Sequence, residues 1–236
     1  VVGTGCNIAA SASIGPLSVI ESDVRIGERV VVGPGCVVQS GVTLEDDVRL
    51  IASVTLGRGV SIGRRTLVHP GCVIGADGFG FANDAGTWLK VPQVGAVRIG
   101  ADVEIGANTT IDRGAIGDTV IEDDVKLDNQ IQIGHNVRIG AHTAIAGCVG
   151  ISGSTSIGRR CLIGGAVGIV GHLTIVDDVV ITGLTMVSRS LTKPGVYSSA
   201  LPAEEARLFR RNAARFRRLD EWYRRSTRGS AQAPLE

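Results

Sequence analysis

A repeat of six residues runs through most of the chain, and it restricts the fold more than any other feature of the sequence. An aliphatic residue recurs at every sixth position from Val2 to Ile74, again from Ile99 to Ile111, and again from Ile121 to Val187. Four residues after each aliphatic residue comes a second restricted position, mostly Val, Thr, Cys, Ala or Ser, and Gly often follows the aliphatic residue directly. This pattern predicts short strands joined by tight turns.

Three such repeats would complete one triangular coil of about 18 residues, and coils would stack about 4.8 Å apart by strand pairing. The chain holds about 28 repeats, enough for nine or so coils and a prism on the order of 45 Å tall. Such a solenoid buries aliphatic side chains and needs no aromatic ones. The four Phe, two Trp and two Tyr residues indeed all lie in residues 78–98 or from Tyr197 onward. We therefore expect an all-β solenoid over residues 1–192.

The repeat is interrupted twice. Residues 78–98 lose the period and contain three of the aromatic residues, and loops of this length are uncommon unless they are functional. We expect this insertion to contact substrate or another subunit, although a lid that packs on its own prism is the alternative. The shorter insertion near residues 112–118 contains the pair Asp112 and Arg113, which could form a corner salt bridge or contact another subunit. We favour the structural role.

The C-terminal part has a different character. Residues 193–226 predict an extension with one basic α-helix, because Phe209, Phe216 and Tyr223 form an apolar stripe at helical spacing. Residues 201–236 hold nine Arg and five acidic residues, a net charge of +4. This charge fits either a solvated helix face or an anionic partner. Residues 227–236 are expected to be a disordered tail.

Composition narrows the remaining possibilities. No apolar run approaches the roughly 20 residues that a membrane-spanning helix needs, and no signal peptide is visible. The five cysteines show no zinc-like spacing, and four of them occupy the second restricted position of the repeat, so we expect free thiols in a reducing compartment such as the cytoplasm. Because the sequence begins at Val1 and not Met, we expect that further residues precede it.

One polar stretch, residues 127–147, stands out within the aliphatic repeat. Counting repeats places His135 and His172 on the same face, two coils and roughly 10 Å apart. His142 falls on the next face, and Asp128 falls on the face before His135. A histidine among amides and a carboxylate is a candidate general base, although a lone surface histidine is the alternative. The count separates His135 from His142, so we expect no zinc site.

Four segments, residues 75–100, 105–119, 128–137 and 194–202, closely resemble one enzyme family. This family comprises the UDP-3-O-(3-hydroxyacyl)glucosamine N-acyltransferases of lipid A biosynthesis. The resemblance implies a left-handed parallel β-helix, whose hand general rules alone would not give. It also implies a homotrimer with active sites between neighbouring prisms. The implied reaction moves a 3-hydroxyacyl chain from acyl carrier protein to the 2-amine of a UDP-sugar, without a metal or other cofactor and without a nucleic-acid partner.

The resemblance also assigns catalytic roles to individual residues. His135 matches the catalytic base of the family, and Asp128 matches its orienting carboxylate. His172 matches a second functional histidine. Gly153 matches a position whose backbone N–H would stabilise the oxyanion.

Four further residues match positions that contact substrate. Asn129 and Gln132 match residues that line the site, and Met186 matches part of a ruler for acyl length. Arg189 and the arginine-rich tail are expected to meet the acidic carrier protein. Ser188 departs from the family, since members can carry a bulky residue there, so the preferred acyl length stays open.

The sequence does not include the N-terminal uridine-binding domain that the family has. Two alternatives to the N-acyltransferase therefore stay open at this point. One is a UDP-N-acetylglucosamine O-acyltransferase, which shares the prism but matches residues 75–100 and 128–137 less well. The other is a non-catalytic trimerisation scaffold.

Overall fold

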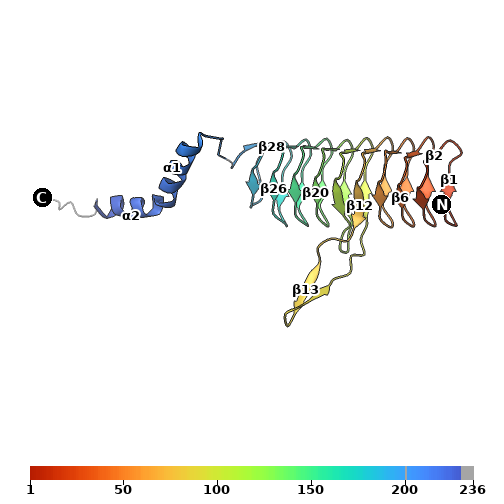
Figure 1. The fold of residues 1–236 in the computed structure, drawn as a ribbon, viewed down its shortest axis with the longest axis horizontal. Helices are drawn as coiled ribbons and strands as arrows, with labels where there is room; N and C mark the ends of the chain where they lie inside the picture. Colours follow the sequence, from red (N-terminus) through yellow and green to blue (C-terminus); the bar gives the residue numbers. More distant parts are fainter. Residues whose placement is uncertain (200, 230–236) are drawn as a thin grey trace. The chain divides into compact units, whose positions relative to one another are not determined.

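The computed structural model describes residues 1–199 and 201–229. The chain divides into two compact units, Val1–Ala200 and Leu201–Glu236. The first unit is a solenoid of stacked coils whose strands form three parallel sheets of nine, ten and nine strands (Figure 1). This architecture confirms the predicted all-β solenoid, a left-handed β-helix of hexapeptide repeats with a helical C-terminal region.

The three sheets are the walls of the prism, and we name them A, B and C. Each coil passes first through wall B, then through wall C and then through wall A. Wall B contains β1 (Asn7–Ile8), β4 (Arg25–Ile26), β7 (Thr43–Leu44), β10 (Ser61–Ile62), β15 (Val97–Ile99), β18 (Thr119–Ile121), β21 (Arg138–Ile139), β24 (Ser156–Ile157) and β27 (Thr174–Ile175). Wall C contains β2 (Ser13–Ile14), β5 (Val31–Val32), β8 (Arg49–Leu50), β11 (Leu67–Val68), β16 (Glu104–Ile105), β19 (Lys126–Leu127), β22 (Ala144–Ile145), β25 (Leu162–Ile163), β28 (Val179–Ile181) and β30 (Gly195–Tyr197). Wall A contains β3 (Val19–Ile20), β6 (Val37–Val38), β9 (Thr55–Leu56), β12 (Val73–Ala76), β17 (Thr110–Asp112), β20 (Gln132–Ile133), β23 (Gly150–Ile151), β26 (Gly168–Ile169) and β29 (Met186–Val187). The turn that follows each wall is the corner of the same letter.

Each strand buries one aliphatic side chain and turns its neighbour outward, as the alternation of a strand requires. In β20, for example, Ile133 is fully buried while Gln132 is exposed. At the corners, a residue in the left-handed region turns the chain, and many of these residues are not glycine. Asn136 (φ 59°) and His172 (φ 61°) are two of them. The buried cysteines among those at the second restricted position fill the inside of the prism.

The long insertion is a hairpin of two antiparallel strands, β13 (Phe81–Asp84) and β14 (Thr87–Lys90), which projects from the side of the prism (Figure 1). It leaves wall A after β12 and rejoins the prism at β15. The insertion was predicted to extend to residue 98, but Val97 is already fully buried and paired with Thr119. The sequence did not reveal this, because Val97 lies outside the six-residue repeat that resumes at Ile99.

The C-terminal region differs in detail from the prediction. Strand β30 continues wall C beyond residue 192, because the half-buried Tyr197 takes the inward place of an aliphatic residue. One helix was predicted, whereas the second unit has two, α1 (Ala206–Arg217) and α2 (Leu219–Gly229). They separate at Arg218, whose backbone N–H bonds back to the carbonyls of Arg215 and Phe216.

Two predictions concerned the end of the chain and membranes. Of the tail predicted to be disordered, residues 227–229 belong to α2, and residues 230–236 lie outside the described residues. Within the described part of the chain, no helix combines the length and apolar character needed to cross a bilayer.

Candidate active site

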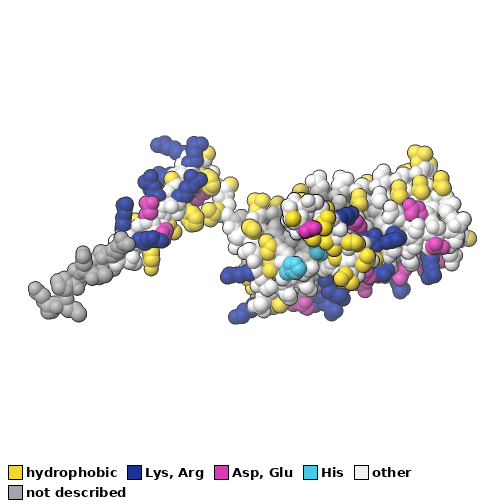
Figure 2. Space-filling model, turned by 90° about the horizontal axis from the view of Figure 1, so that it is seen from below, with side chains coloured by type: hydrophobic (Ala, Val, Ile, Leu, Met, Phe, Trp, Pro, Cys, Tyr) yellow, Lys and Arg dark blue, Asp and Glu magenta, His cyan; other side chains and the backbone are white. Residues whose placement is uncertain are grey.

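A groove of about 710 Å³ runs along wall A, on the side of the prism from which the hairpin projects. Figure 2 shows this side, where histidine side chains reach the surface beside hydrophobic ones. The outward residues of four successive strands form the floor, in the order Gln132, Gly150, Gly168 and Met186. His135 lies at one edge, and Phe79 from the base of the hairpin also lines the groove.

Two glycines make this floor bare. A Cβ atom at Gly150 or at Gly168 would meet no atom within 4 Å, so the packing of the prism does not demand glycine at either place. Their effect is on the surface, because two successive coils present only backbone between Gln132 and Met186. The result is a lane without side chains that runs parallel to the prism axis, a shape that suits a linear apolar chain.

His135 is half-buried at corner A, directly after β20. Its Nδ1 lies 3.0 Å from Oδ1 of Asn136. Its Nε2 lies over the next coil, since a Cβ on Gly153 would be only 2.5 Å from it. Gly78, at the base of the hairpin, covers the other side, and a Cβ there would lie 2.7 Å from the Cβ of His135. Glycines on both sides therefore let the backbone close around the imidazole ring.

The backbone N–H of Gly153 has no hydrogen-bond acceptor among the described residues. At several other corners the equivalent N–H donates to a side chain of a neighbouring coil, as Arg58 N–H does to Gln39 Oε1 and Arg159 N–H does to Asp177 Oδ1. Within the described residues, Gly153 N–H has no such acceptor. The residues that would supply it in the adjacent coils are Gly134 and Gly171, which have no side chain. An unpaired donor thus lies beside Nε2 of His135.

Asp112 also lines this groove, and it was not among the predicted site residues. Burial raises the pKa of its carboxyl group, while the hydrogen bond from Gln132 (Nε2 to Oδ2, 3.1 Å) and the charge of His135 lower it less strongly. Arg113 does have the structural role predicted for the pair, because its buried guanidinium donates to the carbonyls of Gly95 (2.7 Å) and Arg58 (3.2 Å). No ion pair joins it to Asp112 among the described residues. Counting one coil back from His135 would have placed Asp112 at this corner.

His172 lies at corner A two coils beyond His135, as the count predicted. Its side chain is exposed, and its backbone N–H donates to the carbonyl of Gly153 (3.1 Å). His142 lies at corner B, where Nδ1 contacts Asp124 Oδ2 at 2.9 Å. Residues 1–199 and 201–229 contain no group of three His, Cys, Asp or Glu side chains placed to hold a metal ion.

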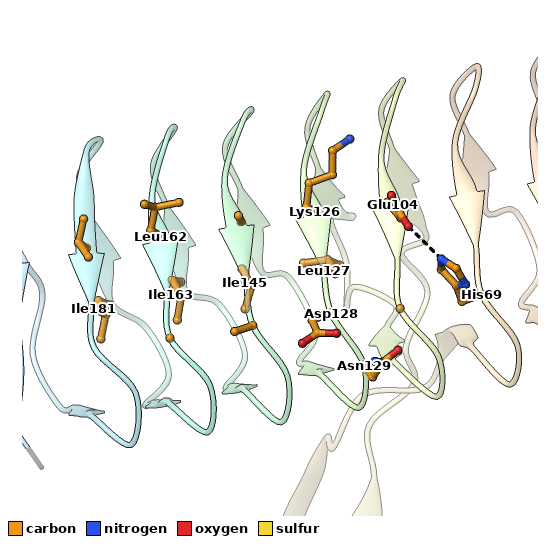
Figure 3. Close-up of a pocket in the computed structure, with 15 residues that line it drawn as sticks. His69, Glu104, Lys126, Leu127, Asp128, Asn129, Ile145, Leu162, Ile163 and Ile181 are labelled. Atoms are coloured by element: carbon orange, nitrogen blue, oxygen red, sulfur yellow. Dashed lines mark hydrogen bonds and ion pairs between the residues drawn. The ribbon is translucent and has the colours of Figure 1, made fainter. Parts of the chain in front are cut away.

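Asp128 and Asn129 lie elsewhere in the chain. Both are exposed at corner C, at the edge of a second groove on wall C (Figure 3). Arg189 lines a third pocket near the last coil, which shares Met186 with the groove on wall A. Within one chain the structure therefore brings together His135, Gly153, Gln132 and Met186, and it places Asp128, Asn129 and Arg189 outside this groove.

The hexapeptide β-helix, together with relatives that are named acyltransferases, makes the chain an acyltransferase of the hexapeptide-repeat class. The model of the bacterial transferase hexapeptide (six repeats) matches residues 5–40 and 118–153, and that of the hexapeptide repeat of succinyl-transferase matches residues 23–58. The chain is 52% identical to UDP-3-O-acylglucosamine N-acyltransferase of Coxiella burnetii (strain Dugway 5J108-111), over 97% of this chain and 67% of that protein. It belongs to the UDP-3-O-acylglucosamine N-acyltransferase family.

Further relatives agree with this assignment. The enzyme of the same name from Hahella chejuensis is 55% identical over 75% of this chain and 51% of that protein. Among solved structures, LpxA from Acinetobacter baumannii has a TM-score of 0.63 at 24% identity, covering 82% of this chain and 71% of that one. UDP-N-acetylglucosamine acyltransferase from Francisella novicida has a TM-score of 0.60 at 21% identity, covering 83% and 65%. At these identities the structures support the fold alone.

Proposed function

We propose that this protein transfers a 3-hydroxyacyl chain from acyl carrier protein to the 2-amine of UDP-3-O-acylglucosamine, a step in lipid A biosynthesis. The acceptor follows the name of its relatives, which are 52% and 55% identical. The observation that carries the proposal is the juxtaposition at corner A, where Nε2 of His135 lies beside the uncapped N–H of Gly153.

The reaction assigns one role to each of these groups. The amine nitrogen attacks the thioester carbonyl carbon, and Nε2 of His135 takes the proton that the nitrogen loses. Negative charge develops on the carbonyl oxygen, and the Gly153 N–H donates to it from a rigid coil. The carbon–sulfur bond then breaks, and the proton passes to the departing thiolate of the carrier. The chemistry is complete without a cofactor or a covalent enzyme intermediate.

The groove on wall A is the proposed site of the acyl chain. The lane over Gly150 and Gly168 is bare. Met186 closes its far end, two coils beyond the coil that contains Gly150 and Gly153. Gln132, held by Asp112, is placed to contact the substrate near the histidine. His172 lies at the same corner two coils beyond His135, where we propose that it contacts the donor.

The walls differ in a way that supports a homotrimer. In wall A, no residue that directly precedes an inward aliphatic residue is charged. The same positions of wall C include the apolar Val31, Leu67 and Leu162 beside the charged Arg49, Glu104 and Lys126. Those of wall B include Arg25, Arg98 and Arg138 and only one large apolar residue, Val120. A closed ring of three copies buries two different faces of each copy and leaves the third in water. We propose that wall A of one copy meets wall C of the next, with wall B outward.

This arrangement explains why Asp128 and Asn129 lie away from His135 within one chain. The corner C of a neighbouring copy would bring both to the groove that contains His135. There the carboxylate of Asp128 would favour the positively charged imidazolium that forms during the reaction. Each active site would then contain residues of two copies.

Two further proposals concern partners and compartment. The arginines of α1 and α2, together with Arg189, supply positive charge for an acidic carrier protein. The five cysteines are all free, which fits a reducing compartment such as the cytoplasm.

An acyl-transfer assay with 3-hydroxyacyl carrier protein tests the proposed function. The wild-type protein should acylate UDP-3-O-acylglucosamine and leave UDP-N-acetylglucosamine unchanged. Replacing the base, His135→Ala, should reduce kcat by about 10²–10⁴-fold while the oligomeric state persists. His142→Ala, an exposed histidine at corner B, is the matched control and should retain wild-type turnover. Near-normal turnover by His135→Ala, or a preference for the second acceptor, would contradict the proposal.

A further inference from the structure

Both interruptions of the repeat occur at corner A, in the two coils that precede His135. The hairpin follows β12, and the shorter insertion follows β17, while corners B and C keep the regular length throughout the described prism. The walls rejoin in register after each interruption, as the pairs Leu67–Glu104 and Thr110–Gln132 show. The interruptions therefore change the surroundings of one corner and leave the prism intact.

The shorter insertion, residues 114–117, wraps around the side chain of Asn136. The backbone N–H of Ala115 donates to Oδ1 of Asn136 (2.9 Å), and Nδ2 of Asn136 donates to the carbonyl of Gly117 (2.8 Å). The N–H of Asn136 donates to Oγ1 of the buried Thr119 (2.8 Å). In the next coil of this corner, the equivalent N–H of Ser154 bonds to a backbone carbonyl instead. The insertion thus replaces a regular corner bond with a cradle for one amide.

The cradle is itself anchored from behind. A Cβ on Gly114 would lie 1.6 Å from the carbonyl oxygen of Gly117, so the insertion closes more tightly than a residue with a side chain allows. The carbonyl of Gly114 accepts from the N–H of Gly95 (2.9 Å) at the end of the hairpin loop. The buried guanidinium of Arg113 also donates to the Gly95 carbonyl. The two interruptions form one bonded unit behind the histidine.

The hydrogen bonds of this unit determine whether the amide oxygen or the amide nitrogen of Asn136 faces His135. A backbone N–H can only donate and a carbonyl can only accept, so Oδ1 is the atom near Ala115 and Nδ2 is the atom near Gly117. Oδ1 is also the atom 3.0 Å from Nδ1 of His135. An oxygen there requires a proton on Nδ1, which leaves the lone pair of the neutral ring on Nε2.

We propose that Asn136 is the positioning residue of His135. It holds the ring in the tautomer whose free lone pair, on Nε2, faces Gly153 and the groove. This inference rests on the proposed function and deepens it, because a general base must present its lone pair to the amine. It also assigns orientation of the ring to an amide of the same chain. The carboxylate of Asp128, expected to orient the ring, is left to interact with the imidazolium by charge.

The first test measures the tautomer and needs no substrate. In protein labelled with ¹⁵N, the ring nitrogens of His135 are assigned by comparison with His135→Gln. Where the ring is neutral, the wild-type spectrum should show the proton on Nδ1. In Asn136→Ala the signal should shift towards the mixture found in free histidine. A wild-type ring with its proton on Nε2 would overturn the proposal, and so would an unchanged tautomer in Asn136→Ala.

The second test measures kcat against pH. Asn136→Asp keeps an acceptor beside Nδ1 and adds a negative charge, which favours the imidazolium form of the base. The acidic limb of the profile should therefore move to higher pH by about one to two units. Asp112, the acidic residue that faces His135 from β17, is present in both the wild type and Asn136→Asp, so its charge does not cause a difference between the two profiles. Asn136→Ala should lower kcat by at least about tenfold with little change in KM.

The matched control is Asn7→Asp, which makes the same change at an exposed position of wall B in the first coil, away from the groove. It should leave both the profile and the tautomer as in the wild type. A profile that stays fixed in Asn136→Asp would overturn the proposal. If the wild-type protein transfers no acyl group, the proposed function fails, while the tautomer measurement still decides the role of Asn136.

Discussion

The carboxyl group of Asp112 lies in a partly buried place at the groove on wall A, where its charged form is poorly solvated. Burial raises its pKa above the value of an exposed aspartate, and the single hydrogen bond from Gln132 does not compensate. An acid whose pKa is higher in the folded chain than in the unfolded one costs folding free energy once the pH exceeds the unfolded value of about 3.9. Below that pH the cost disappears, because both states are protonated.

We therefore expect Asp112→Asn to be more stable than the wild type at neutral pH. The gain should appear as a rise of a few degrees in Tm at pH 7, since the amide oxygen can still accept from Gln132. At pH 3 the two proteins should unfold at the same temperature. Thermal unfolding followed by circular dichroism measures both, with Asp84→Asn in the exposed hairpin as the control. An equal or lower Tm at pH 7 would contradict the prediction.

Single residues could be placed from the sequence only where the repeat was regular. Counting put His135 and His172 at one corner because every coil between them has 18 residues. The same count could not show the role of Asn136, since its partners lie in four inserted residues without a period. It also could not show that Gly153 lacks a cap, because that depends on three glycines in adjacent coils meeting at one corner.

At the scale of the elements, the prism combines two kinds of glycine. Those of the floor, Gly150 and Gly168, have open space where a side chain would lie. Others are packed against backbone, and a Cβ on Gly140 would lie 2.6 Å from the carbonyl carbon of Gly158. The first kind shapes the surface and the second kind permits the coils to stack.

Replacing Gly168 by Val should accordingly change specificity and spare the fold. The added side chain would stand in the lane between Gly150 and Met186, so transfer should shift towards shorter acyl donors by at least about tenfold in relative kcat/KM. Its Tm should stay close to that of the wild type. Gly140→Ala is the control with the opposite expectation, a lower Tm with unchanged preference. An unaltered donor preference in Gly168→Val would show that the acyl chain lies elsewhere.

The sequence predicted the strands of the prism well because two-residue strands and corners obey one repeated pattern. It predicted the ends of the insertion and the C-terminal region less well. Val97 and Tyr197 return to the prism outside the run of regular repeats, where a single inward residue gives no period to count. The helix break at Arg218 likewise has no glycine or proline to announce it.

At the scale of the whole molecule, the proposed trimer makes a prediction about shared sites. If Asp128 acts on His135 of the neighbouring copy, then Asp128→Ala and His135→Ala chains should complement each other. A mixed trimer contains one interface with both residues intact, so co-expressed chains should recover part of the wild-type activity. Trimers of either variant alone should remain inactive.

Purified mixed trimers, separated by distinct affinity tags and tested for acyl transfer, measure this effect. Chains that carry both substitutions, mixed with His135→Ala chains, provide the control and should recover no activity. Absence of recovery in the first mixture would mean that Asp128 acts within its own chain or not at all. The separation of Asp128 from His135 on different corners of one chain makes the complementation outcome the expected one.

The return of each wall to register after an interruption has a consequence for how such a protein can change over generations. A coil bonds only to the coils before and after it, so an excursion at a corner alters neither the core nor the remaining height of the prism. Corner A has accepted a hairpin and a four-residue segment in consecutive coils. It is thus a place where chain length can vary without disturbing the buried core, beside the residues that we propose to meet the substrate. New acceptor preferences can arise there by insertion or loss of a few residues.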